Sequence, residues 1–338
     1  MARDPLRVAI DLSGPPEPLG NWMALLAGAL RDGDGCDVVT FQSERDPSEH
    51  PDVRVRGRAL WRAQWHRGMG RRVDRVLPRV DLVHVAGRAT PPTRDVPLLV
   101  TVDDLRPLRG DSRGRQRVAQ LRRVVARGAQ LVASSRTAGL EVQRALGLPR
   151  ESVVSVPPAV SFGHDVTEGE DLVVHVTGAS EFFLACAPAL VAGARARGAR
   201  LVALVSREAG LRVRQAGPGV TVRHRSDAAS VLMRARMVVH LSDGARFPTV
   251  IVAALSAGVP TCATSTPVNR ELLDGASVLV DDGDSGAVAS AVDDLWENES
   301  RRSVLTAAGR ARAADYSPPV AAQRYAALYG SLVSRVRA

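Results

Sequence analysis

The sequence of 338 residues contains no lysine, few aromatic residues and only three cysteines. All 45 basic residues are therefore arginines, so no site can use a lysine ammonium as a base, a Schiff-base former or a phosphate ligand. The cysteines Cys36, Cys186 and Cys262 lie far apart, with no second cysteine or histidine at zinc-ligand spacing. We therefore expect no disulfide framework, no metal site and a reducing, cytoplasmic setting.

Long hydrophobic runs are also absent. The amino terminus lacks the apolar stretch of a signal peptide, and no run of 18 apolar residues could span a bilayer. The net charge is +9, and arginine is concentrated in two stretches, residues 54–79 and 106–127. Such patches attract phosphates or acidic lipids, but no nucleic-acid-binding module accompanies them. We expect no nucleic-acid partner, and contact with the inner face of the cell membrane stays open.

Short apolar runs alternate with helical patterns, which is typical of a parallel α/β sheet. The length favours two domains. The expected strands are 6–12, 36–41, 81–87, 97–104, 129–135, 152–160, 171–178, 199–206, 220–225, 237–242, 259–265 and 276–282. The expected helices are 20–31, 58–79, 112–127, 136–146, 184–197, 227–235, 248–257, 267–274, 285–296 and 318–336. Residues 161–170 are polar and without periodicity, so they are the expected linker.

The stretch 58–79 has apolar residues at every fourth position, Trp61, Trp65, Met69 and Val73, with arginines around them. Two interpretations stay open. The helix could rest on an anionic membrane, or it could pack its apolar stripe on the sheet of the first domain, which we favour. His175 and His240 lie within apolar strands, and we expect them to be core or strand-end residues.

Five segments, in order along the chain, resemble family 4 of the retaining glycosyltransferases. They are DLVHVAG (81–87), PLLVTVDDL (97–105), the stretch LVASSRTAG to SVPPAV (131–160), SAGVPTCATS to VDDGD (256–284) and DYSPPVAAQRYAALY (315–329). The resemblance implies an α/β fold of GT-B architecture. This architecture has two Rossmann-like doubly wound domains, with a C-terminal helix that crosses back to the first. The implied parts are 1–162 for the acceptor, 163–316 for the donor, and the returning helix 317–338.

The same resemblance implies a nucleotide-sugar donor, a metal-independent reaction, no cofactor, and a glycan or lipid-linked acceptor. Yet the charged residues of the family pattern are missing. Leu184, Ala185 and Cys186 stand where the family has its Arg-containing segment, and the family's lysine has no equivalent. Ala245 and Ala253 stand at the two glutamate positions.

Other residues could replace the missing charged residues of the family pattern. Arg207 or Arg246 could contact the diphosphate, because arginine binds phosphate bidentately. The candidate donor-binding residues are Gly178, Arg207, His224, Asp243, Arg246, Phe247, Pro248, Thr249, Thr264 and Ser265. On the acceptor side the candidates are Gly20 and Trp22. Asp103 replaces the family's histidine beside Asp104, and a raised pKa there would suit acid/base catalysis, although a turn-capping role is the simpler interpretation.

Two functions follow. The protein is either a hexosyltransferase of glycan or glycolipid biosynthesis with a changed donor site, or a catalytically inactive homologue. The inactive homologue would be a pseudoenzyme that supports an active glycosyltransferase partner or binds a glycan. The loss of three separate parts of the family pattern favours the second for activity, and the family ancestry holds under both.

Overall fold

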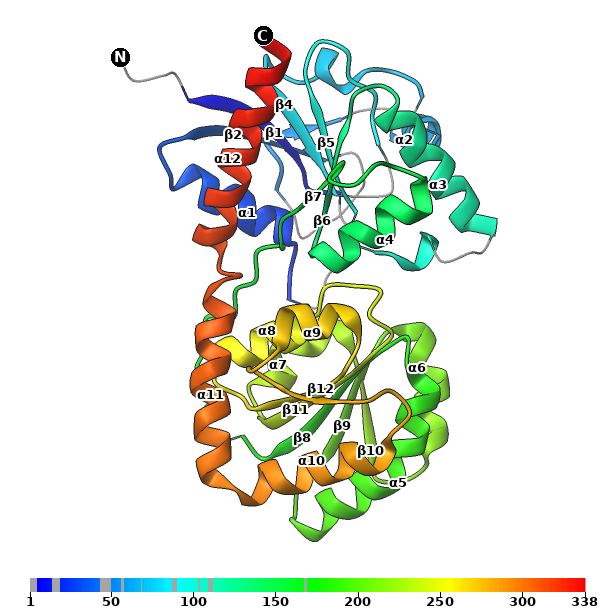
Figure 1. Ribbon diagram of the computed structural model, residues 1–338, viewed down its shortest axis with the longest axis vertical. Coiled ribbons are helices and arrows are strands. Elements are labelled where there is room, and N and C mark those ends of the chain that lie inside the picture. Colours follow the sequence, from blue (N-terminus) through cyan, green and yellow to red (C-terminus); the bar gives the residue numbers. More distant parts are fainter. Residues whose placement is uncertain are drawn as a thin grey trace. The chain divides into compact units, whose positions relative to one another are not determined.

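The computed structural model describes residues 5–13, 19–42, 50–55, 58–67, 69–86, 90–102, 104–108, 112–166 and 169–337. They form two compact units (Figure 1). Unit 1 comprises residues 1–16, 21–159 and 318–338, and unit 2 comprises residues 17–20 and 160–317. The domain limits expected from the sequence, after residues 162 and 316, lie close to these. Leu19 differs, because it packs against the core of unit 2.

Unit 1 contains a seven-stranded parallel sheet covered by helices. The strands are β1 (Leu6–Asp11), β2 (Cys36–Gln42), β3 (Val53–Arg54), β4 (Leu82–Val85), β5 (Leu98–Val102), β6 (Gln130–Ala133) and β7 (Val153–Ser155). The helices are α1 (Trp22–Arg31), α2 (Arg58–Trp65), α3 (Ser112–Val125), α4 (Arg136–Leu146) and α12 (Pro318–Arg337), with 3-10 turns η1 (Val73–Arg75) and η2 (Arg106–Leu108). The strand order is β3-β2-β1-β4-β5-β6-β7.

Unit 2 contains a six-stranded parallel sheet of order β10-β9-β8-β11-β12-β13. Its strands are β8 (Asp171–Thr177), β9 (Leu201–Val205), β10 (Val220–His224), β11 (Ala235–Ser242), β12 (Thr261–Thr264) and β13 (Val278–Val280). Its helices are α5 (Ser180–Ala196), α6 (Arg207–Val213), α7 (Ala228–Leu232), α8 (Thr249–Ser256), α9 (Pro267–Leu273), α10 (Ser285–Glu297) and α11 (Glu299–Ala314), with 3-10 turns η3 (Arg214–Ala216) and η4 (Arg225–Asp227).

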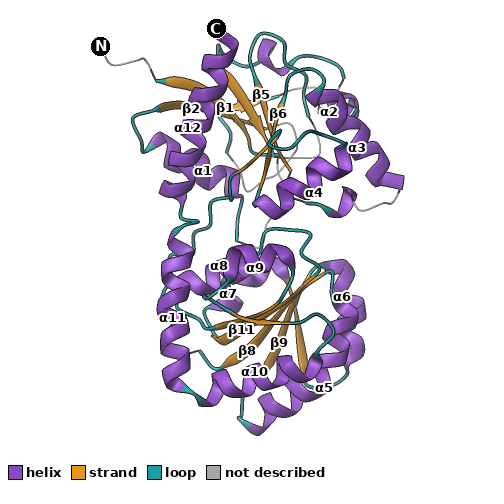
Figure 2. Cartoon of the chain, in the orientation of Figure 1, coloured by secondary structure: helices purple, strands orange, loops and turns teal. Residues whose placement is uncertain are grey.

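Helices lie on both faces of each sheet (Figure 2). In unit 2, the residues of α7, α8 and α9 form one apolar cluster against the sheet, and those of α5 and α10 form another. The alternation of the strand side chains produces this division. Val173 and Val238 belong to the first cluster, whereas Val174 and Val239 belong to the second. Strands covered on both faces are apolar throughout, which explains the continuous runs in the sequence.

The C-terminal helix α12 belongs to unit 1, where it runs alongside α1 (Figure 1). Tyr325 and Tyr329 of α12 are completely buried, and they join Trp22, Met23 and Leu26 of α1 in one apolar cluster. The chain therefore returns from unit 2 to complete the core of unit 1. The predicted fold, with two Rossmann-like units and a returning helix, is confirmed.

Local signals fixed most helix limits. Helix α4 has the predicted bounds because Ser135 caps its first turn, accepting from the Ala138 amide at 3.0 Å, and Gly147 ends it in the left-handed conformation. The predicted helix 58–79 is wrong beyond Trp65. Gly70 adopts a φ of +98° and only the short turn η1 follows, so apolar spacing alone overestimated that helix. Helices α6 and α11 and strand β3 were not predicted.

Among the residues that the structure describes, none of the helices combines the length and the apolar character that a membrane span requires.

Candidate functional site

The strand order of unit 2 reverses direction between β8 and β11. Doubly wound sheets bind ligands at such a switch point, outside the carboxyl ends of the strands. Here the two strands end at Thr177 and Ser242, and Gly178 forms an antiparallel bridge with Ser242. The Asp243 amide donates to the Thr177 carbonyl at 3.0 Å. Two predicted donor residues, Gly178 and Asp243, are thus brought together at this point.

Gly178 has a steric reason to be glycine. Its φ is +74°, a region that other residues rarely adopt, and a Cβ at this position would overlap the Asp243 carboxylate. The carboxylate itself accepts from the Ala245 amide at 3.0 Å. The turn after β11 is therefore held by backbone bonds, and it presents an acidic side chain beside a backbone without a side chain.

Two helices begin at this switch point without a side-chain cap. Helix α5 follows β8 after Ala179, and helix α8 follows β11 after Pro248, and neither preceding residue caps the first turn. Within the described chain, no residue accepts a hydrogen bond from the amides of Val250 or Ile251, which are both completely buried. Unpaired amides at the positive end of a helix attract anions, and phosphate groups in particular.

Six other helices show the contrast. Each is preceded by a residue whose side chain accepts from a first-turn amide: Asn21, Ser135, Ser206, Thr266, Asp284 and Asn298. Helix α7, which follows Asp227, also begins without a side-chain cap, so the switch point is distinguished by having two open helix starts together. Sequence analysis named the start of α8 but missed the start of α5, although the stretch Gly178-Ala179 between a strand and a helix was a readable signal.

Thr264 and Ser265 lie beside this turn at the end of β12. The Thr264 hydroxyl accepts from the Ser242 amide at 3.0 Å and lies 3.1 Å from the Ser242 carbonyl oxygen. Asn269 donates from Nδ2 to the Thr264 carbonyl at 2.9 Å. Because Thr264 is completely buried, its side chain supports the turn. Ser265 is half-buried, and its hydroxyl accepts from Arg270 at 3.0 Å.

Phe247 and the two alanines of the acidic pattern lie in the interior. Phe247 is buried, and its ring meets that of Tyr316 edge to face at 5.4 Å. Ala245 and Ala253 have no exposed surface. The residues of α8 between Val250 and Leu255 are all buried, so this helix offers ligands its amino end and no polar side. Pro248 is buried at that end and Thr249 is half-buried.

The predicted basic residues differ in their surroundings. Arg207 is exposed at the first position of α6, directly after β9, and no described residue forms a hydrogen bond or ion pair with its side chain. Arg246 is half-buried. His224, at the end of β10, is exposed and accepts from the Ser226 amide at Nδ1, at 3.2 Å. In the neutral imidazole this bond leaves the proton on Nε2, which is a free donor.

A pair of buried histidines lies beneath the switch point. His175 of β8 and His240 of β11 are register partners, with their Nδ1 atoms 3.0 Å apart and their rings stacked at 4.9 Å. Burial lowers the pKa of His240 to about 4 and, with the charges of His240 and Arg225, lowers the pKa of His175 well below its usual value. Both rings are therefore neutral at pH 7, and one donates its Nδ1 proton to the other. They are core residues, as expected.

Unit 1 has its own switch point, between β1 and β4. Gly20 follows β1 along the chain but belongs to the segment 17–20 of unit 2; its φ is +94°, and a Cβ at this position would meet no neighbouring atom. Asp103 lies outside the described residues. Asp11, at the end of β1, is buried, and its carboxylate accepts from the Ser13 amide at 3.0 Å. Sequence analysis did not select Asp11, because a single acidic residue ending a strand carries no pattern.

Trp22 is only 7% exposed. Its ring packs against His84 at 6.2 Å and Tyr325 at 6.1 Å, so the indole is part of the core. His84 lies 2.7 Å from the Tyr329 hydroxyl and 2.8 Å from the Thr101 hydroxyl, and burial lowers its pKa to about 3. An acceptor can therefore meet only the edge of Trp22.

In the arginine-rich region of unit 1, some of the apolar side chains are buried and others are exposed. Trp65 is buried and donates from Nε1 to the Arg71 carbonyl at 2.9 Å, so it belongs to the core. Leu60 and Met69 are exposed. The described residues contain no cluster of three or more histidine, cysteine or acidic side chains that could hold a metal ion.

Comparison with known proteins agrees with this geometry. Residues 19–163 match the family model "Glycosyltransferase Family 4", and residues 172–298 match "Glycosyl transferases group 1". A search of curated proteins finds no matching sequence.

Solved structures resemble the whole chain. One is WaaG, a glycosyltransferase involved in lipopolysaccharide biosynthesis, with a TM-score of 0.70 and 14% identity over 95% of this chain and 99% of that one. Another is the sucrose-phosphate synthase from Thermosynechococcus elongatus, with a TM-score of 0.67 and 15% identity over 98% and 100%. HepE from Anabaena, solved with UDP-glucose, has a TM-score of 0.65 and 16% identity over 97% and 100%. The chain thus consists of two glycosyltransferase-type domains with the GT-B fold.

Proposed function

We propose that the protein is a glycosyltransferase of glycan or glycolipid biosynthesis that binds a nucleotide sugar at the carboxyl ends of β8 and β11. The observation that carries the proposal is the pair of uncapped helices, α5 and α8, that begin at the switch point of unit 2. Amides at the start of a helix attract phosphate groups, which supports binding of the donor diphosphate at this point. A similar fold is known with UDP-glucose bound, in HepE from Anabaena.

Transfer of the sugar requires that the leaving nucleoside diphosphate be stabilised. A hydroxyl oxygen of the acceptor forms a bond to the anomeric carbon, the bond from that carbon to the diphosphate breaks, and the nucleoside diphosphate leaves with the bonding electrons. The hydroxyl proton passes to a base. Fixed positive groups near the leaving oxygen lower the barrier, because negative charge grows there. In this proposal the helix ends, Arg207 and Arg246 supply that charge, without a metal or other cofactor.

The remaining donor residues take supporting roles. Asp243 receives a sugar hydroxyl across Gly178, where no side chain obstructs the approach. Thr249, Ser265 and His224 offer hydroxyl and imidazole groups to the ribose or base. Buried residues act through the backbone: Thr264 by fixing the turn at Ser242, and Phe247 and Pro248 by fixing the start of α8.

On the acceptor side, the proposal assigns Gly20, the edge of Trp22 and Asp103, with Asp103 as the acid/base candidate. A lipid-linked acceptor would place unit 1 near a membrane. The exposed side chains of Leu60 and Met69, beside exposed arginines such as Arg67 and Arg71, suit contact with an anionic inner membrane surface from the cytoplasm.

A second candidate function is favoured by a different observation. Alanines stand at the two glutamate positions of the family pattern, Ala245 and Ala253, and both are completely buried, so neither position offers a carboxylate to a ligand. A pseudoenzyme that supports an active glycosyltransferase, or that binds a glycan without transfer, would show this arrangement. It would retain nucleotide binding weakly or not at all.

Calorimetry distinguishes the two candidates. UDP, GDP and their sugar conjugates are titrated into the purified protein and into the variants Arg207→Ala and Arg246→Ala. The matched control is Arg195→Ala, which removes an exposed arginine at the opposite end of α5. The donor proposal expects micromolar binding, weakened about tenfold or more by either site variant and unchanged in the control. No binding of any nucleotide at millimolar concentration would reject it and leave the second candidate.

A further inference from the structure

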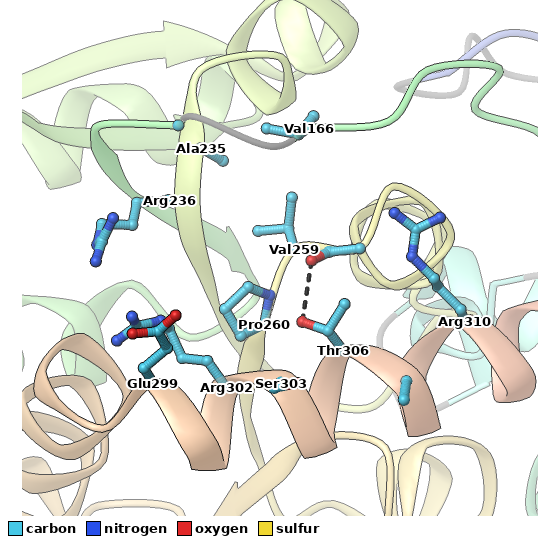
Figure 3. A pocket seen from close by; sticks show the side chains of 13 residues that line it. Val166, Ala235, Arg236, Val259, Pro260, Glu299, Arg302, Ser303, Thr306 and Arg310 are labelled. Carbon is cyan, nitrogen blue, oxygen red and sulfur yellow. Dashed lines mark hydrogen bonds between the residues drawn. The ribbon is translucent and has the colours of Figure 1, made fainter.

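A pocket lies at the end of the unit 2 sheet where β11 and β12 begin, opposite the switch point. It encloses about 510 Å³ and is lined by the strand starts Ala235 and Pro260, the residues Gly258 and Val259 after α8, and one face of α11 (Figure 3). Strand β11 separates this pocket from the turn at Asp243. Eight residues at about 3.3 Å each place the two sites roughly 25 Å apart. The pocket is therefore independent of the proposed donor site.

Three arginines line the pocket, Arg236, Arg302 and Arg310, with Glu299 as the single acidic side chain of its lining. Arg310 already has an anionic partner, because it donates to the Asp165 carboxylate at 2.6 Å. In the described part of the chain, Glu299 forms no ion pair with Arg236 or Arg302. The lining has an excess of positive charge around Arg236 and Arg302.

Arg302 has one occupied nitrogen. Its Nη1 donates to the carbonyl oxygens of Leu295 and Trp296, at 3.1 and 2.6 Å, and so caps the end of α10. These bonds hold the guanidinium in place on the pocket wall. Among the residues that the structure describes, none accepts a hydrogen bond from its Nε or Nη2, so these nitrogens can donate to a ligand. Figure 3 shows Arg302 and Arg236 on the same side of the pocket.

Arg236 is the less satisfied of the two. Its Nε is buried and has no hydrogen-bond acceptor in the described structure. Its guanidinium lies over the Trp296 ring, 5.2 Å from the ring centre. Burial lowers the pKa of Arg236, the charge of Arg302 lowers it further, and Glu299 opposes this only as the weakest influence. A buried N–H without an acceptor destabilises the folded protein, so an anion that accepts from Arg236 would stabilise this part of the pocket.

We propose that this pocket binds a small phosphorylated molecule of the sugar-phosphate class, with Arg236 and Arg302 holding its phosphate. A phosphate dianion offsets two neighbouring guanidinium charges, and the planar donor fork of arginine matches its oxygens. The volume exceeds that of inorganic phosphate and falls within the range of small-molecule sites. Ser303 and Thr306 line the remaining space with hydroxyls, and Val259 supplies an apolar wall.

The test uses the full chain and calorimetry in a phosphate-free buffer of low ionic strength. Glucose 6-phosphate, inorganic phosphate and citrate are titrated separately. The variants are Arg236→Gln and, because Arg302 also caps α10, Arg302→Gln as a second one with its folding checked by circular dichroism. The matched control is Arg301→Gln, an equal change of charge one residue away on α11, where the arginine pairs with Asp294 outside the pocket.

Glucose 6-phosphate is expected to bind several-fold more tightly than inorganic phosphate, and Arg236→Gln is expected to weaken both by about tenfold. Arg301→Gln and the donor-site variant Arg207→Ala should bind as the natural protein does, which separates this site from the proposed donor site. Equal binding by the natural protein and both pocket variants, or no saturation by any probe, would show that Arg236 only packs on Trp296. Tighter binding of citrate would overturn the assignment to phosphate.

Discussion

The two units share one sheet architecture and differ at their switch points. In unit 1, Asn21 closes the junction before α1, because its Oδ1 accepts from the Met23 amide at 3.0 Å and its Nδ2 donates to the Leu12 carbonyl at 2.8 Å. In unit 2, Ala179 and Pro248 precede helices without capping them. The same fold thus produces one junction satisfied by its own side chain and one left open to an anion.

The buried histidines differ in a related way. In unit 1, Ile10 is the register partner of His84, whose two ring nitrogens lie near the hydroxyls of Tyr329 and Thr101. In unit 2, His175 and His240 are register partners and bond to each other. A buried imidazole needs partners. Unit 1 obtains them from the returning helix α12 and from a neighbouring strand, and unit 2 from within its central strand pair.

The largest effect is expected from restoring a carboxylate to α8. Ala253→Glu places an ionisable group in a core without exposed surface, which should raise its pKa by about 3–5 units. Because the carboxyl is then largely protonated in the folded state at pH 7 and ionised in the unfolded state, the variant should lose about 3–4 kcal/mol of stability at that pH. Urea unfolding measures the loss. Ala253→Gln is the neutral control, and only the Glu variant should regain stability as the pH falls and its carboxyl is protonated. A Glu variant as stable as the natural protein would show that α8 borders an open site.

Acidification should destabilise both units, and it should destabilise unit 2 more, because unit 2 contains two neutral buried histidines and unit 1 contains one. In the unfolded chain histidine takes up a proton near pH 6.5, whereas burial lowers the pKa of His84 to about 3 and of His240 to about 4. The unfolded state therefore binds more protons between these values. Each neutral buried histidine should cost about 1.4 kcal/mol of stability per pH unit below 6.5.

Urea unfolding at pH 7.5, 6 and 5 tests this dependence. The double variant His175→Asn/His240→Asn should reduce the loss of stability between pH 7.5 and 5 more than His84→Asn does, since two titrating groups are removed. A natural protein whose stability is constant from pH 7.5 to 5 would contradict the assignment of neutral imidazoles.

A smaller loss is expected where α12 meets unit 1. Tyr329→Phe removes the hydroxyl 2.7 Å from His84 and leaves a buried ring nitrogen without that partner, at a cost of about 1–3 kcal/mol. Denaturant unfolding measures it. Because the two residues interact, the double variant with His84→Leu should lose less stability than the sum of the single variants. Additive losses would mean that the bond contributes nothing.

The smallest effects come from exchanging the caps. Asn21→Ala should destabilise the protein by about 1 kcal/mol and leave nucleotide affinity unchanged. Ala179→Asp should stabilise α5 by several tenths of a kcal/mol, since a carboxylate favours the positive end of a helix. It should also weaken nucleotide binding several-fold by repelling the diphosphate. Thermal unfolding and calorimetry on both variants check the pair, and unchanged binding by Ala179→Asp would remove α5 from the donor site.

Prediction from sequence succeeded where the signal was local. Ser135 and Gly147 bound α4 correctly, and the apolar runs located the strands, because a doubly covered parallel strand must be apolar throughout. It failed beyond Trp65, where a repeat of four was taken for one long helix. For the predicted ligand contacts Trp22 and Phe247, the sequence did not show that their rings are largely buried, because a family position does not reveal how much of a side chain remains exposed.

The sequence by itself determined the architecture of this protein and showed that the charged donor residues of the family pattern are missing, since hydrophobic periodicity, helix caps and residue types can be read from the sequence alone. Only the tertiary structure decided which groups share a place. It brought Gly178 against Asp243, joined two uncapped helix ends at one switch point, and set Arg236 beside Arg302 at the opposite end of the same sheet. These neighbours come from different strands and helices, so their proximity follows from strand order and packing, which no local pattern encodes.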